Sequence, residues 1–215
     1  MSRPQRNDFD GAWHHVMNRG SGHRPVFRDT LDRIVFLELL ADAARRHLVA
    51  VHAYCLMGNH FHILVENRGG SVAKTMQDLS GRYTRRFNAR EGQDGPIFRG
   101  RYHSVEVRGD AHLLLVSRYI HANPVAAGLC SDCRDWRWSS APAYLGLAPR
   151  PVWLMTSFVL SLFSEPTTTA YGQFMAAGID GPTTAFYAGD GLRVVFDPEF
   201  EQGALGVRHP RKAGV

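Results

Sequence analysis

The chain has 215 residues, of which 44% are hydrophobic and 21% charged, a composition typical of a globular protein with one well-packed core and an extension. No run of about 18 apolar residues is present, and residues 1–6 lack the apolar segment of a secretion signal. Three cysteines argue against a disulfide framework. We therefore expect no membrane partner and predict a cytoplasmic protein.

The charge of the chain is basic and unevenly distributed. The formal net charge is +5 and the isoelectric point is about 9.4. Arginine supplies 23 of the 25 basic residues, and residues 151–215 carry a net charge of −2, which leaves +7 in residues 1–150. Genomic base composition also raises arginine content, but arginine suits phosphate recognition and stacking on bases. The pattern favours a polyanionic partner; if that partner is DNA, the cytoplasmic protein would be associated with the nucleoid when bound to it.

Alternation and helical periodicity predict the order of elements along the first 128 residues. Asp29 and Thr30 offer an N-cap before apolar residues at helical spacing, and Ser71 begins a second such segment. Gly58 and Asn59, which tolerate positive φ, predict a turn between two strands. Asp110 is expected to cap a third helix and Pro124 to stop it. The predicted elements are strands at 12–19, 48–57, 60–66 and 101–108, and helices at 31–47, 71–90 and 111–122.

This order, β-α-β-β-α-β followed by a helix, predicts an α+β, ferredoxin-like sandwich: an antiparallel sheet with two helices on one face and an added helix. From about residue 130 the signals weaken. We expect a main domain at residues 1–128, a packed extension with a short helix at 129–165, and a loosely organised tail at 166–215.

Two histidines, His60 and His62, lie one residue apart in an apolar, β-branched segment. In a strand, residues i and i+2 project from the same face about 6.5–7 Å apart, so both imidazoles can bind one divalent cation. Phe61 should point the other way, into a core. Alone, such a pair is usually structural.

The predicted third helix carries Tyr119 and Asn123, four residues apart and so on one face. A tyrosine phenol can act as a covalent nucleophile. An amide oxygen can complete the coordination of Mg²⁺ or Mn²⁺. Phosphoryl transfer needs a nucleophile and a cation to neutralise phosphate oxygens, and these residues together with His60 and His62 offer both.

The chain resembles the REP-associated tyrosine transposases, which belong to the HUH superfamily of single-tyrosine, insertion-sequence-200-like transposases. The resemblance covers roughly residues 3–163. It is carried by the segments at 9–16, 52–66, 83–88, 97–102, 117–125, 138–140 and 143–146, which include Gly58-Asn59-His60-Phe61-His62 and Tyr119-Ile120-His121-Ala122-Asn123-Pro124.

The resemblance implies an HUH transposase catalytic domain at residues 1–128. It implies that Tyr119 is the nucleophile and that His60, His62 and Asn123 bind Mg²⁺ or Mn²⁺. It further implies a transposase and single-strand endonuclease that cleaves and rejoins hairpin-bearing single-stranded DNA from palindromic repeats, through a 5′-phosphotyrosine intermediate, as a monomer or homodimer. Two alternatives stay open: an inactive relative that binds nucleic-acid hairpins without cleavage, and an RNA-binding module whose histidines are structural.

Other residues have competing interpretations. Tyr83 is a rival nucleophile that lacks an accompanying amide, and its helix more simply packs it inward. His52 is expected on the strand face opposite to the histidine pair, and His121 about 200° around the helix from Tyr119. Cys130 and Cys133 have zinc-knuckle spacing, but no second pair follows. The predicted nucleic-acid-binding residues are Arg82, Arg85, Arg86, Arg99, Arg101 and Arg118.

Overall fold

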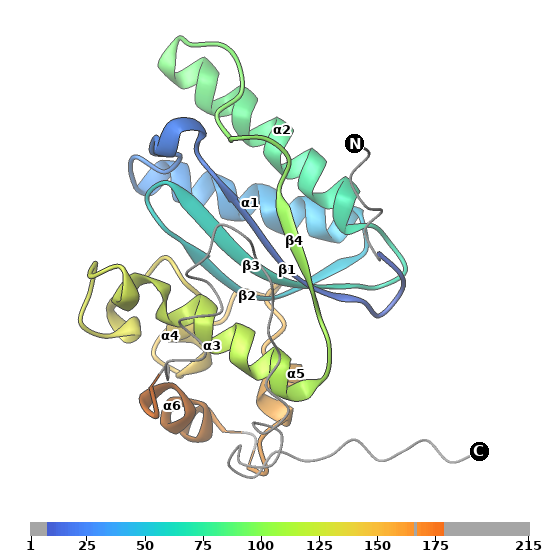
Figure 1. Ribbon diagram of the computed structural model, residues 1–215, viewed down its shortest axis with the longest axis vertical. Helices are drawn as coiled ribbons and strands as arrows, with labels where there is room; N and C mark the ends of the chain where they lie inside the picture. Colours follow the sequence, from blue (N-terminus) through green and yellow to red (C-terminus); the bar gives the residue numbers. More distant parts are fainter. Residues whose placement is uncertain (1–7, 166, 179–215) are drawn as a thin grey trace.

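A computed structural model describes residues 8–165 and 167–178. Its centre is an antiparallel sheet with strand order β2-β3-β1-β4, and two helices, α1 and α2, lie side by side on one face (Figure 1). This arrangement confirms the predicted ferredoxin-like sandwich. The strands are β1 (Trp13–Arg19), β2 (Val49–Leu56), β3 (His60–Asn67) and β4 (His103–Val107), and the two helices are α1 (Thr30–Arg46) and α2 (Val72–Glu91).

Helix α1 begins at the predicted N-cap, and Ser71, which was expected to begin the second helix, is the N-cap of α2. The side chain of Asp29 accepts a hydrogen bond from the backbone N–H of Asp32, and Ser71 accepts one from the N–H of Lys74. Gly92, in the left-handed conformation with φ of 60°, ends α2. Local capping therefore fixes both helices at the positions where they cover the sheet.

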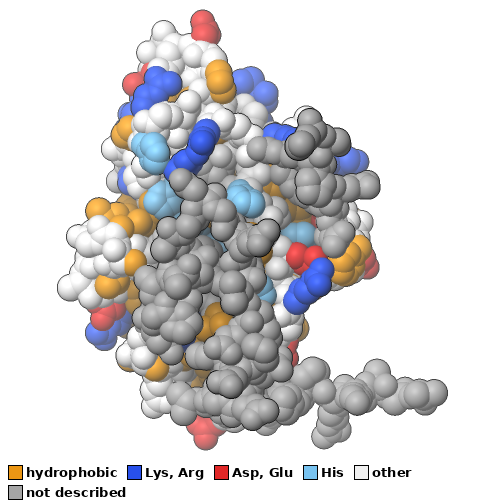
Figure 2. Space-filling view, in the orientation of Figure 1, with side chains coloured by type: hydrophobic (Ala, Val, Ile, Leu, Met, Phe, Trp, Pro, Cys, Tyr) orange, Lys and Arg blue, Asp and Glu red, His pale blue; other side chains and the backbone are white. Residues whose placement is uncertain are grey.

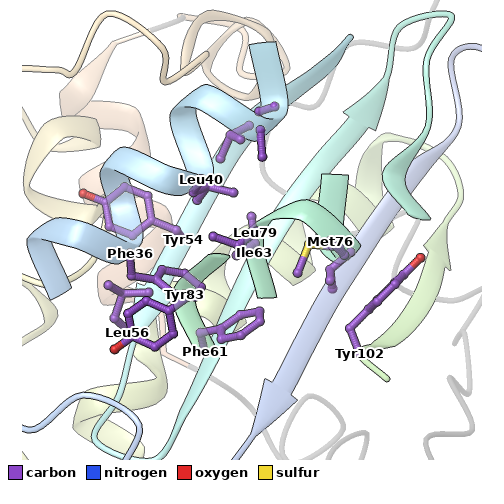
Figure 3. Close-up of a cluster of buried hydrophobic side chains, with 14 of the residues drawn as sticks. Phe36, Leu40, Tyr54, Leu56, Phe61, Ile63, Met76, Leu79, Tyr83 and Tyr102 are labelled. Carbon is purple, nitrogen blue, oxygen red and sulfur yellow. The ribbon is translucent and has the colours of Figure 1, made fainter. Parts of the chain in front are cut away.

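A first hydrophobic core lies between these two helices and the sheet (Figure 3). Phe61 and Ile63 of β3 point into it, as strand alternation predicts, and Tyr83 of α2 is buried beside them. The ring of Phe36 on α1 packs edge-on against that of Tyr83, with 5.1 Å between their centroids. One face of β3 therefore packs in this core, and His60 and His62 lie on the opposite face of the strand.

A second layer covers the opposite face of the sheet (Figure 1). Ala53 and Leu64 from the sheet pack there against Leu113 and Ile120 of the third long helix and against Tyr144 of the extension. This layer contains α3 (Asp110–Ala126), α4 (Ala141–Tyr144), α5 (Ser157–Ser161) and α6 (Thr168–Ala176). The described residues also form two short 3-10 helices, η1 (Ser21–His23) and η2 (Cys133–Asp135). The sequence did not predict α6, which lies in the part expected to be loosely organised.

Helix α3 differs at both ends from the prediction. Gly109, with φ of 75°, is its N-cap, and Asp110 is already the first helical residue. Pro124 lies inside the helix, which continues to Ala126. A proline near a helix end removes a single hydrogen bond, here the one to the Ile120 carbonyl, so the last residues of the helix can still form.

The connection between β2 and β3 also differs in its geometry. Neither Gly58 nor Asn59 adopts positive φ. Instead, the Gly58 carbonyl accepts hydrogen bonds from the N–H groups of Val26 and Phe27, and the Asn59 carbonyl accepts one from the N–H of Gly20. The turn is thus held by the loop that follows β1, an interaction that local sequence does not reveal.

Among the helices of the described residues, none combines the length and the apolar character needed to span a lipid bilayer.

Candidate active site

Strand β3 presents both histidines of the pair on the sheet face that α3 covers. The rings of His60 and His62 lie with centroids 5.1 Å apart and planes at 90°. His62 is buried, with 5% of its surface exposed, whereas His60 is half-buried. The pair therefore sits at the boundary between the second core and solvent.

Helix α3 brings Tyr119 to this pair. The phenol ring lies edge-on to the imidazole of His62, with 5.4 Å between centroids and an interplanar angle of 90°. Asn123 lies one turn further along, and its amide nitrogen donates a hydrogen bond to the Tyr119 carbonyl at 2.8 Å. The structure thus brings the predicted nucleophile against one of the predicted metal ligands, with the amide in the next turn.

A third imidazole, that of His15 on β1, also belongs to this cluster. Its Nε2 lies 3.0 Å from Nδ1 of His62, and its ring centroid lies 5.8 Å from that of Tyr119. Only 1% of its surface is exposed. Sequence reasoning missed this residue: alternation in the segment 12–19 gives its face, but the proximity to His62 depends on the pairing of β1 with β3, 47 residues apart.

Burial keeps the imidazoles of this cluster neutral. It lowers the pKa of His15 to about 3, assisted by the nearby His112 and His103. It lowers the pKa of His62 well below 6.5, assisted by His15 and His60, and it lowers the pKa of His60. Neutral imidazoles have the lone pairs that metal ligation requires.

Burial raises the pKa of the Tyr119 phenol, while a side-chain hydrogen bond with Asn123 acts in the opposite direction. The free protein therefore holds this tyrosine as a protonated phenol at neutral pH. An attack by its oxygen requires loss of the proton as the new bond forms.

The chemistry of the predicted donor set is of a kind that suits a divalent cation. The described residues contain no group of three or more His, Cys, Asp or Glu side chains arranged to hold a metal ion. The candidate set is of another kind, since it pairs two neutral imidazoles, His60 and His62, with an amide, Asn123. Amide oxygens suit Mg²⁺ and Mn²⁺, and two or three protein ligands leave room for phosphate oxygens.

Comparison with known proteins decides the family. The family described as "Transposase IS200 like" matches residues 9–123, more than half of the chain, and this stretch includes His60, His62, Tyr119 and Asn123. The chain belongs to the IS200-like transposase family.

Solved structures support the fold of this transposase. A REP-associated tyrosine transposase bound to a REP hairpin is similar over 69% of this chain and 89% of that chain, with a TM-score of 0.57 and 18% identity. A putative transposase from Deinococcus radiodurans matches 55% of this chain and 95% of that chain, with a TM-score of 0.39 and 16% identity, too low to support an argument. No curated protein matches the chain significantly.

The structure separates the six predicted DNA-binding arginines of the transposase into three environments. Arg85, Arg86, Arg99 and Arg101 are exposed and make no ion pair within the described ranges. Arg82 pairs with Asp42 of α1, on the sheet face opposite to Tyr119. Arg118 is buried, with its guanidinium 4.5 Å from the centre of the Phe174 ring. Because its side chain packs inside the protein, the prediction of an exposed DNA contact at Arg118 needs correction.

Two of the exposed arginines lie near the histidine pair. The N–H of Arg99 donates to the carbonyl of Arg19, and Arg19 pairs with His60 across the sheet. The amide of Asn18 donates to the carbonyl of Gly100 at 3.1 Å, which fixes the segment carrying Arg101 to β1. In Figure 2, histidine side chains gather near the middle of the face shown and lysine or arginine side chains lie above them.

Tyr83, the alternative candidate for the nucleophile, lies in the first core. Tyr83 is 1% exposed, its hydroxyl donates to the Val26 carbonyl, and burial raises its pKa. It is on the opposite side of the sheet from His60 and His62. Tyr83 is therefore a structural residue.

The two other histidines considered from the sequence are structural as well. His121 hydrogen-bonds to the Tyr171 and Ser140 hydroxyls at 2.7 Å each, away from the pair, as its helical phase predicts. His52 was expected on the opposite face, but a bulge in β2 next to it places its ring against Trp13, 4.1 Å between centroids, on the face of the second core. There it hydrogen-bonds to Glu66, apart from the active-site cluster.

The cysteines of the transposase are free thiols in the structure. Cys133 is buried and burial raises its pKa to about 11, so it is a poor metal ligand at neutral pH.

Proposed function

We propose that this transposase cleaves and rejoins hairpin-bearing single-stranded DNA through a covalent 5′-phosphotyrosine at Tyr119. The observation that carries the proposal is the packing of the Tyr119 phenol edge-on against His62 at 5.4 Å, on the face where His60 also lies. A half-buried tyrosine that only packed against a core would not need two neutral imidazoles and an amide near it.

In the proposed reaction the hydroxyl oxygen of Tyr119 bonds to the phosphorus of a phosphodiester while the bond from phosphorus to the 3′ oxygen breaks. The phenol loses one proton and the leaving 3′ oxygen gains one, so the products are a 5′-phosphotyrosine and a free 3′-OH. Attack of a 3′-OH on the phosphotyrosine reverses these changes. Rejoining therefore requires no nucleotide cofactor.

The residues of this chain position the reaction. His60, His62 and Asn123 would hold Mg²⁺ or Mn²⁺, which supplies positive charge to the phosphate oxygens. The hydrogen bond from Asn123 to the Tyr119 carbonyl ties the amide to the turn that carries the nucleophile. The packing of Tyr119 against His15 and His62 restricts the phenol to the side of the sheet where the phosphate would bind.

The proposed DNA partner is a hairpin with adjoining single strand. The similar REP-associated transposase was solved with a REP hairpin bound, and in this chain the exposed Arg99 and Arg101 offer phosphate contacts beside the strand ends near His60. Arg85 and Arg86 of α2 are also exposed. Arg82 and Arg118 are excluded because their guanidinium groups are engaged within the protein.

The test is covalent capture on labelled single-stranded hairpin DNA in the presence of Mn²⁺. The wild-type chain should give an adduct that survives denaturing electrophoresis. Tyr119→Phe should abolish it, because the nucleophilic oxygen is removed while hairpin binding remains within about threefold, as is usual for a change confined to one hydroxyl.

Tyr83→Phe is the matched control, since it removes a hydroxyl from the other side of the sheet and should leave the adduct intact. Hairpin binding without any adduct in the wild type would contradict cleavage and favour a binding-only relative. Absence of both hairpin binding and the adduct would favour the RNA-binding module whose histidines are structural.

A further inference from the structure

Each histidine of the pair has one ring nitrogen already engaged by the protein. Nδ1 of His60 lies 2.7 Å from the side-chain oxygen of Asn59, and Nδ1 of His62 lies 3.0 Å from Nε2 of His15. Among the described residues, no hydrogen bond reaches Nε2 of either histidine. A neutral imidazole that binds a metal through one nitrogen must carry its proton on the other, so these two interactions bear on metal binding.

The interaction at His60 has a defined direction. The side-chain nitrogen of Asn59 donates to the His23 carbonyl at 3.2 Å, and a carbonyl can only accept. The amide of Asn59 is therefore oriented with its oxygen toward His60. Because that oxygen also only accepts, Nδ1 of His60 must carry the proton, and Nε2 keeps its lone pair.

Asn59 is itself held firmly. Its backbone carbonyl accepts a hydrogen bond from the N–H of Gly20 at 2.8 Å, and the neighbouring Gly58 carbonyl accepts two from the loop after β1. This series of hydrogen bonds thus runs from the backbone carbonyl of His23 through the Asn59 side chain to Nδ1 of His60. It sets the proton position on the ring without requiring a charged partner.

The interaction at His62 is buried. His15 is 1% exposed and His62 is 5% exposed, so water has little access to the hydrogen bond between them. The rings lie 5.1 Å apart and are inclined by 33°. Either imidazole could donate, but Nε2 of His62 keeps its lone pair only when His62 donates from Nδ1 and His15 accepts at Nε2.

We propose that Asn59 and His15 are positioning residues that hold His60 and His62 in the Nδ1-protonated form, so that both Nε2 atoms are available to one divalent cation. The inference rests on the proposed function, which supplies the need for the cation. It assigns a role to a histidine 47 residues away from its partner in the sequence and to the asparagine of the β2–β3 turn.

The test begins with the metal-free full chain. Long-range ¹H–¹⁵N spectra of ¹⁵N-histidine-labelled protein distinguish protonated from unprotonated ring nitrogens, and single substitutions assign the signals. We expect Nδ1 protonation at His60 and His62 and an unprotonated Nε2 at His15. His15→Leu should give a mixture of tautomers at His62, and Asn59→Ala should do the same at His60.

Mn²⁺ affinity, measured by electron paramagnetic resonance, is the second readout. His15→Leu and Asn59→Ala should weaken binding by about 10- to 100-fold, the usual effect of removing an outer partner of a ligating histidine. His15→Gln supplies an amide oxygen as acceptor and should stay within about threefold of wild type, even if His15→Leu folds poorly. His52→Gln, at a buried histidine bonded to Glu66, is the matched control and should bind as wild type does.

Protonation of Nε2 at His60 or His62 in the wild type would overturn the inference, as would unchanged Mn²⁺ affinity in both His15→Leu and Asn59→Ala. A wild-type chain that forms no DNA adduct and binds no Mn²⁺ would instead contradict the proposed function. In that case the tautomers of the metal-free protein still decide whether Asn59 and His15 set the proton positions.

Discussion

Identical side chains take opposite roles in this protein according to their surroundings. The hydroxyl of Tyr83 donates to a backbone carbonyl inside the first core, whereas Tyr119 is half-buried beside two imidazoles, those of His15 and His62. The histidines divide in the same way: His60 and His62 each keep one ring nitrogen without a partner among the described residues, while His121 bonds through both. Residue type alone does not separate these cases; the neighbours of each polar atom do.

Buried neutral histidines should make the stability of the protein depend on pH. Burial, assisted by the positive charge of Arg68, lowers the pKa of His52 to about 4. The hydrogen bond to Glu66 and the charge of its carboxylate act in the opposite direction. In the unfolded chain its pKa returns to about 6.5, so as the pH falls below 6.5 the unfolded state binds a proton that the folded state excludes. The contribution is complete above pH 6.5 and is lost progressively down to pH 4.

We therefore expect the free energy of unfolding to fall from pH 7 to pH 4, with His52 responsible for up to about 3 kcal/mol of the change. Urea titrations across this range measure it. His52→Gln should reduce the dependence of stability on pH, whatever its effect at pH 7. A slope identical to that of wild type would show that His52 does not titrate in this way.

At the scale of elements, the helix that carries Tyr119 is joined to α6 and to the extension through buried polar groups. The Tyr171 hydroxyl of α6 bonds to His121 at 2.7 Å and to the Ser117 hydroxyl at 3.2 Å, both on α3. His121 in turn bonds to Ser140, whose hydroxyl also donates to the carbonyl of Tyr54 in β2. The extension thus fixes α3 against the sheet and, with it, the position of the nucleophile.

Tyr171→Phe should lower the free energy of unfolding by about 1–3 kcal/mol, because it leaves buried partners on α3 unsatisfied. Chemical denaturation gives the value, and hydrogen exchange should show faster opening of α3. Tyr54→Phe is the control: this buried tyrosine makes no hydroxyl hydrogen bond within the described residues, so its substitution should cost less than about 0.5 kcal/mol. Equal effects of the two substitutions would argue against the network.

At the scale of the whole molecule, some arginines are engaged in ion pairs and others are exposed without one among the described residues. Many arginines of α1 and α2 are neutralised by ion pairs, such as Arg82 with Asp42 and Arg90 with Asp29 and Asp32. Arg99 and Arg101 remain exposed next to the strand that pairs with His60. The net charge of the chain therefore overstates its unpaired positive charge. The exposed arginines Arg85, Arg86, Arg99 and Arg101 are the candidates for the proposed DNA contacts.

The double variant Arg99→Ala/Arg101→Ala should weaken hairpin binding and reduce the slope of log K against log salt concentration by about 1.4, or about 0.7 for each phosphate of the single strand that an arginine no longer neutralises. Fluorescence anisotropy at several salt concentrations measures both quantities. Arg45→Ala/Arg46→Ala removes the same charge from α1, where both arginines pair with Asp42, and should leave the slope unchanged. Similar weakening in the two variants would mean that only net charge matters.

The sequence by itself determined the local features of this protein: the N-cap at Asp29, the start of a helix next to Ser71, the common face of His60 and His62, and the helical phase that separates His121 from Tyr119. These follow from the periods of strand and helix, which operate over a few residues. Only the tertiary structure decided that His15 contacts His62, that a bulge turns His52 to the other face, that Arg118 is buried under Phe174 and that α6 packs on α3. Each of these depends on which distant segments meet, and hydrophobic periodicity specifies the face that an element buries without specifying the element that covers it.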